Sequence, residues 1–126
     1  MRVRQAVVVV LALLAAAGCS SSEGGEDEQL LTEQRGNYCL KLGTWQKARN
    51  ARGTSTSESP TAETAAAEKA AAEDTFLATR PLREESVSGG RTLGEETVWA
   101  ITDGDAKAEG RLVQYCADSG FETLTR

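Results

Sequence analysis

The fold is decided by residues 31–45, which read LTEQRGNYCLKLGTW. Four large apolar residues of this stretch lie at intervals of seven, four and three positions: Leu31, Tyr38, Leu42 and Trp45. These intervals place them on one face of an α-helix, and Cys39 borders that face. The spacing therefore predicts a helix over about residues 27–50. A kink or break at Gly43 is the alternative to a continuous helix, because glycine costs about 1 kcal/mol in a helix interior.

The second apolar pattern lies near the C-terminus, in residues 93–118. Its members recur with a helical period: Val98, Ile101, Ala108, Leu112 and Tyr115. We predict two helical pieces here, at about 93–102 and 105–118. Asp103 or Asp105 is expected to cap the start of the second piece, because aspartate is a favoured N-cap residue.

This segment also permits a different reading. Residues 97–102 are rich in β-prone side chains and precede Asp103-Gly104, a turn signal, so a hairpin that pairs 97–102 with 111–116 is the alternative. On the helical reading, Gly120 adopts a left-handed conformation at the helix end. Phe121 then folds back onto the last turn.

The middle of the chain has little to bury. Residues 53–60 are rich in Ser and Thr and predict a disordered linker. Residues 61–79 are dominated by Ala, Glu and Lys and predict a helix that begins near Thr61 and ends before Pro81. Large apolar residues occur only at the end of this segment, so we expect the helix to be docked only in part. The following connection has two candidate core residues, Leu82 and Val87.

The N-terminal residues have the order of a secretory signal. Arg2 and Arg4 precede an apolar run over residues 6–17, which stops at Gly18-Cys19 and gives way to Ser, Gly and Glu. At about 1.5 Å per residue, this run is shorter than the roughly 30 Å hydrocarbon core of a membrane. The order resembles the lipobox of bacterial lipoproteins, here Ala16-Ala17-Gly18-Cys19, with alanine where the family prefers Leu, Val or Ile.

The resemblance implies that residues 1–18 are a lipoprotein signal peptide and that Cys19 is the lipid attachment site. Cys19 would carry a diacylglyceryl group with fatty acyl chains such as palmitate. Residues 19–26 would form a flexible acidic tether, and the domain of residues 27–126 would be held on the extracytoplasmic face of the cell membrane. The alternative is an ordinary secretory signal cut after residues 15–17, which would leave Cys19 unmodified.

Two further cysteines, Cys39 and Cys116, remain for the exported domain. An even remainder in an oxidising compartment indicates a disulfide bond. On the loop-entropy model, closing a loop of this length stabilises the fold by about 4 kcal/mol. Two buried free thiols are the alternative. A zinc site would need more ligands, and the chain has no histidine.

The composition disfavours several classes of function. Without residues 1–18 the chain has 12 basic and 19 acidic residues, a net charge near −7, which argues against binding nucleic acid. The absence of histidine excludes Ser-His-Asp and Cys-His catalysis. The adjacent carboxylates Glu84-Glu85 and Glu95-Glu96 are interpreted as solvated or helix-start charges. We expect no catalytic residue, no metal ligand and no cofactor.

Together these features predict an all-α fold, a small bundle of three to four helices stapled by one disulfide, with a core built from the first and last segments. Four aromatic residues are candidates for that core or for a partner surface: Tyr38, Trp45, Trp99 and Tyr115. The resemblance is to small envelope lipoproteins of bacteria. This resemblance adds location rather than activity. Our first hypothesis is a non-catalytic binding or accessory module that is anchored to the membrane and presented to an envelope protein partner. The alternative is a structural spacer without a specific ligand.

Overall fold

The computed structural model describes residues 20–54 and 61–123. Across these residues the chain forms four α-helices and one short 3-10 helix. Their bounds are α1 Ser20–Thr54, α2 Ala62–Thr79, η1 Arg80–Leu82, α3 Leu93–Thr102 and α4 Ala106–Asp118. The predicted all-α bundle is confirmed. The hairpin alternative is wrong, because residues 97–102 and 111–116 are helical.

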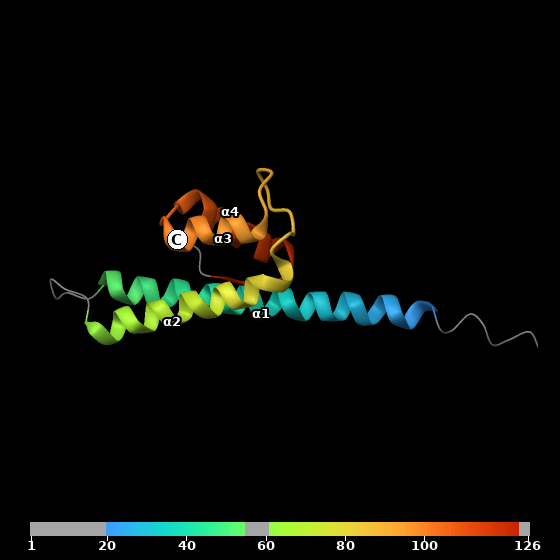
Figure 1. Cartoon of the computed structure of the whole chain (residues 1–126), viewed down its shortest axis with the longest axis horizontal. Coiled ribbons are helices and arrows are strands. Elements are labelled where there is room, and N and C mark those ends of the chain that lie inside the picture. Colours follow the sequence, from blue (N-terminus) through green and yellow to red (C-terminus); the bar gives the residue numbers. More distant parts are fainter. Residues whose placement is uncertain (1–19, 55–60, 124–126) are drawn as a thin grey trace, which may run out of the picture.

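The helices form two layers (Figure 1). α1 and α2 run antiparallel, side by side, in one layer, and α3 and α4 lie over them in the second layer. Between the layers lies a single core, to which α1 contributes Tyr38, Cys39, Leu42 and Trp45. The predicted core residues Leu82 and Val87 are both buried, which confirms them.

α1 is longer than its apolar stripe predicts. It begins at Ser20, so residues 20–26, which we expected to form a flexible tether, are helical. Adding residues to an existing helix avoids the cost of nucleation, so a helix can extend past its packed part. It also continues through Gly43 to Thr54, which rules out a break there. Residues 53–54 of the predicted linker belong to α1. Residues 55–60, the signal peptide and Cys19 lie outside the described residues.

α2 packs along α1 through small side chains. Its buried residues all lie in the second half of the helix: Ala71, Thr75, Ala78 and Thr79. The large apolar residues at the end of α2 are Phe76 and Leu77, and Leu77 does not dock the helix, because its exposure is 54%. Ion pairs to α1 flank this contact, Lys41 with Asp74 at 3.3 Å and Arg52 with Glu68 at 2.9 Å. The core is therefore not built from the terminal segments alone.

Local signals define the helix ends as predicted for α2 and α4. The hydroxyl of Thr61 accepts a hydrogen bond from the Thr64 amide at 3.2 Å, so Thr61 is the N-cap of α2. Of the two candidate caps for α4, the structure selects Asp105, whose carboxylate accepts from the amides of Lys107 and Ala108. This cap satisfies two amides that the first helical turn leaves without a partner.

The C-terminal end of α4 is a Schellman motif. Gly120 has φ of +87°, its amide donates to Ala117, and the amide of Phe121 donates to the carbonyl of Cys116 at 2.8 Å. This geometry turns the Phe121 ring onto α1 at Gly36, where a Cβ atom would lie 2.9 Å from the ring. The predicted left-handed conformation of Gly120 is confirmed, whereas the contact that the structure shows for the Phe121 ring is with Gly36 of α1 rather than with the last turn of α4.

Candidate functional site

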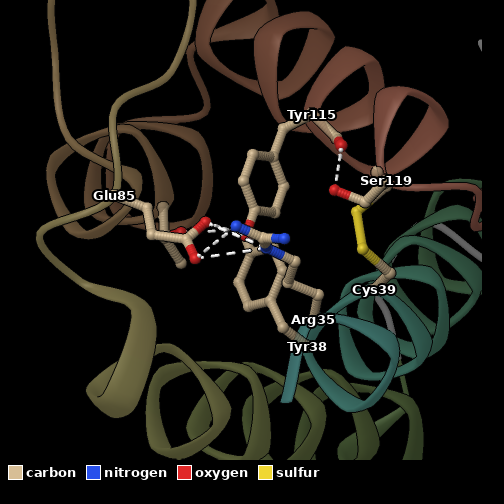
Figure 2. The surroundings of a disulfide bond; sticks show 8 residues. Arg35, Tyr38, Cys39, Glu85, Tyr115 and Ser119 are labelled. Atoms are coloured by element: carbon tan, nitrogen blue, oxygen red, sulfur yellow. Dashed lines mark hydrogen bonds and ion pairs between the residues drawn. A yellow bond between two sulfur atoms is a disulfide. The ribbon is translucent and has the colours of Figure 1, made fainter. Parts of the chain in front are cut away.

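The disulfide is the centre of the candidate site (Figure 2). Cys39 of α1 and Cys116 of α4 are bonded, with 5.8 Å between their Cα atoms, as predicted. Both residues are buried. The bond therefore joins the α1–α2 layer to the α3–α4 layer from inside the core.

The predicted aromatic residues divide into two groups. Tyr38 and Trp45 are buried, and Tyr115 is half-buried, with its ring edge-on to that of Tyr38 at a centroid distance of 6.1 Å. These three belong to the core or its margin. Trp99 does not, because its side chain is 42% exposed and the guanidinium of Arg91 lies 4.2 Å from the centre of its ring.

Trp99, which was a candidate for the core or for a partner surface, lies outside the core because α3 buries a different face. The residues of α3 that point inward are Leu93, Glu96, Thr97 and Ala100. Two of them are polar, so the apolar stripe did not indicate them. Of the stripe residues on α3, Ile101 packs against the core as predicted, whereas Val98 does not. As a result Val98 is 45% exposed and Trp99 lies beside it on the outer face.

The buried hydroxyl of Thr97 is satisfied by residues from two elements. It donates its single proton to the Leu93 carbonyl at 2.7 Å, so it accepts from the hydroxyl of Tyr38, 2.8 Å away. This bond links α1 to α3 across the core. Burial raises the pKa of Tyr38 above its ordinary value, which keeps the phenol neutral and able to donate.

A second polar cluster lies beside the disulfide and joins three segments of the chain (Figure 2). Arg35 of α1 donates to both carboxylate oxygens of Glu85, with the shortest distance 3.0 Å. The hydroxyl of Tyr115 donates to the same carboxylate at 2.5 Å. Burial, followed by the hydrogen bond to Glu85, raises the pKa of Tyr115, and the bond to Glu85 raises that of Arg35.

Two further carboxylates are buried, which the sequence did not suggest. Glu96 has no exposed surface and accepts two hydrogen bonds from Arg111, at 2.7 and 3.1 Å. Glu109 accepts from Gln46 at 2.9 Å and from the guanidinium of Arg49. The interpretation of Glu85 and Glu96 as solvated charges is wrong, because each one has an arginine partner from another segment.

The other member of each carboxylate pair behaves as predicted. The side chain of Glu84 is 80% exposed. Glu95 forms a capping box with Thr92, in which its carboxylate accepts from the Thr92 amide at 2.9 Å, so it is a helix-start charge. The ion pairs of Glu85 and Glu96 were not identifiable from the sequence, because the arginine partners lie 50 and 15 positions away along the chain, respectively.

The ion pairs of this arrangement cross-link segments of the fold that are distant in the sequence. The carboxylates of Glu85, Glu96 and Glu109 are each held by a guanidinium, which stabilises their charged form. Within the described part of the chain, no group of three or more Cys, Asp or Glu side chains is placed to hold a metal ion. Among the helices that the structure describes, none combines the length and the apolar character needed to cross a bilayer.

Comparisons with protein-family models, curated proteins and solved structures found no match to this chain.

Proposed function

We propose that this protein is a membrane-anchored, extracytoplasmic lipoprotein whose helical domain is a non-catalytic binding or accessory module of the bacterial cell envelope. Cys19 would carry the lipid. An envelope protein would be the partner of the domain. The argument for anchoring and the argument for binding rest on different observations.

The order of the first nineteen residues supports the anchor, and the disulfide is consistent with export. Disulfides persist in oxidising compartments and are rare in the reducing cytosol. Cys39 and Cys116 are bonded to each other, so Cys19 is the one remaining cysteine in the sequence. Two acyl chains on that residue would give stable membrane attachment, whereas one chain binds only marginally.

The shape of α1 suits a domain that stands away from its anchor. The N-terminal turns of this helix extend beyond the other helices (Figure 1). Residues 25–30 are exposed, so the domain does not pack around this part of α1. A lipid at Cys19 would precede this projecting arm by one residue, and the arm would separate the bundle from the membrane surface.

The outer face of α3 carries the argument for a binding module over a spacer. Trp99 and Val98 are adjacent and both more than 40% exposed, and Arg91 lies over the indole ring. Tryptophan and arginine contribute most to binding energy in protein interfaces. A spacer has no need to present a tryptophan to solvent, and burying its ring elsewhere would have stabilised the fold.

Fractionation of the native host tests the anchor. Wild-type chain is expected in the membrane fraction, where detergent releases it and high salt does not. Cys19→Ala should lose the lipid and be processed differently, because it lacks the thiol that forms the thioether. Recovery of Cys19→Ala with the same membrane distribution and mature mass as wild type would overturn the proposal.

Crosslinking in intact cells tests the binding surface. The full chain, recovered through a C-terminal tag, should bring down a protein whose yield falls in Trp99→Ala. Leu77→Ala is the matched control, since Leu77 is also an exposed apolar residue but lies on α2. Equal recovery of every crosslinked protein from both variants and wild type would favour the spacer.

A further inference from the structure

A polar pocket of about 310 Å³ opens where the two layers meet, beside the Arg35–Glu85 ion pair. Its walls come from α1, from the connection that follows η1 and from the last turn of α4. Six of the residues that line it matter for its chemistry: Arg35, Glu85, Ser88, Tyr115, Asp118 and Ser119. The exposed surface of α3 around Trp99 lies on other residues, so this pocket is a separate feature.

The polar side chains of the pocket are held in place before any ligand arrives. Arg35 and Tyr115 both donate to the carboxylate of Glu85, so each of the three fixes the others. The backbone of Glu85 is also fixed, because its amide donates to Leu82 at 2.9 Å and its carbonyl accepts from Leu93 at 2.8 Å. Preorganised groups lose little conformational freedom on binding, which favours affinity.

Hydrogen-bond donors and acceptors alternate within this small space. A guanidinium has five N–H donors, and Glu85 accepts from two of the three nitrogens of Arg35, so the third can still donate. The hydroxyl of Ser119 donates to the Tyr115 carbonyl at 2.9 Å, and its oxygen can still accept. Ser88 is exposed at the rim, and its hydroxyl can both donate and accept a hydrogen bond.

The charges of the pocket select against ionic ligands. Glu85 already neutralises Arg35, and Asp118 adds a negative charge, so an anion would meet no uncompensated positive group. A cation would meet Asp118, but that carboxylate already accepts a hydrogen bond from Gln114 at 2.7 Å, and the guanidinium of Arg35 lies in the same pocket. A neutral molecule with several hydroxyl groups fits both the charges and the alternating donors and acceptors.

We infer that this pocket is a binding site for a neutral polyhydroxylated molecule, about one sugar ring in size. Its volume lies near the lower end of the range for ligand pockets, roughly 300–1,000 Å³, which suits one ring better than a chain of rings. The inference goes beyond the proposed function. Binding here is a property of the folded domain, and it holds whether or not Cys19 carries lipid.

The test is saturation-transfer NMR on the full chain in a detergent without sugar groups. The probes are the methyl glycosides of glucose, galactose, mannose and N-acetylglucosamine. At least one should receive saturation from the wild-type chain. Ser88→Trp should fill the pocket and weaken binding of that probe by about tenfold, without removing a contact of Arg35, Glu85 or Tyr115. Ala66→Trp, on the exposed side of α2, is the matched control and should bind like wild type.

Three outcomes would overturn the inference. One is the absence of transfer to every probe at about 20 mM, a concentration that detects millimolar affinity. The second is binding that Ser88→Trp leaves unchanged, which would place the sugar elsewhere. The third is displacement of the sugar by inorganic phosphate at equal concentration, which would make the pocket an anion site.

Discussion

The hydroxyl of Tyr115 donates a hydrogen bond to the carboxylate of Glu85, with 2.5 Å between the oxygens. Tyr115 belongs to α4, whereas Glu85 lies in the connection before α3, so this bond links the two segments. Ionisation of the phenol would replace the bond by repulsion between two negative charges. Tyr38 faces a similar restriction, because it is fully buried and donates to Thr97.

We expect neither tyrosine to ionise near its ordinary pKa while the chain is folded. The chain has only two tyrosines, and the fold raises the pKa of both. A group whose pKa is raised by folding stabilises the fold fully below its unfolded pKa, about 10 for tyrosine. That stability is lost as the pH rises further. Absorbance of tyrosinate should therefore appear only together with unfolding by circular dichroism.

The same titration in denaturant is the control, and there both tyrosines should ionise with a midpoint near pH 10. A folded chain in which one tyrosine titrates normally would contradict the hydrogen bonds assigned to that residue. Tyr115→Phe distinguishes the two groups, since it leaves Tyr38 as the only signal.

Two glycines of α1 should respond differently to substitution by alanine. Gly43→Ala introduces a methyl group with no atom within 4 Å, so it should stabilise the fold by about 0.5–1 kcal/mol through helix propensity. Gly36→Ala places its Cβ 2.9 Å from the ring of Phe121, so the ring must move and the gain should disappear. Urea unfolding of both variants measures the difference.

A double-mutant cycle tests whether the Phe121 ring causes the expected loss of stabilisation in Gly36→Ala. If Phe121 is what opposes a side chain at position 36, then adding Gly36→Ala to Phe121→Ala should recover the stabilisation that alanine normally brings to a helix. Destabilisation by Gly36→Ala that persists without the Phe121 ring would show that another contact excludes the methyl group.

The buried ion pair between Glu96 and Arg111 should be costly to break. Arg111→Ala leaves the fully buried carboxylate of Glu96 without its partner, and we expect a loss of about 3 kcal/mol in the free energy of unfolding. Glu84→Ala, which removes a mostly exposed carboxylate, should change it by no more than about 0.5 kcal/mol. Similar effects of the two substitutions would mean that Glu96 is hydrated in solution.

Reduction of the disulfide should weaken the contact between the layers. Melting the chain with and without a thiol reductant compares the same side chains, and reduction should remove up to about 4 kcal/mol of stability. The reductant should have no effect on the double variant Cys39→Ala/Cys116→Ala. Identical melting of oxidised and reduced wild type would show that the ion pairs and the core alone hold the layers together.

The sequence predicted the parts of this fold that depend on local signals. The helix starts at Thr61 and Asp105 and the turn at Gly120 follow from the chemistry of single residues. The disulfide followed from the count of cysteines. The buried face of α3 was predicted only in part, because Ile101 packs against the core but Val98 is exposed. Glu96 and Thr97 are buried instead, against Arg111 and Tyr38, which are distant in the sequence.

The packing of α2 was underestimated for a related reason. Its buried face consists of alanine and threonine, which carry no apolar pattern that could be recognised. The threonine hydroxyls are satisfied within the helix, since Thr75 donates to Ala71 and Thr79 donates to Thr75. Threonine can therefore line the interface with α1 without leaving a polar group unpaired.

Intact-mass spectrometry of the chain isolated from host membranes tests the central claim most directly. We expect a mature species that begins at Cys19, carries a diacylglyceryl group and gains two hydrogens on reduction of the Cys39–Cys116 bond. A species that begins at Ser20 or later and lacks lipid would contradict the claim that this helical domain is held at the membrane by Cys19.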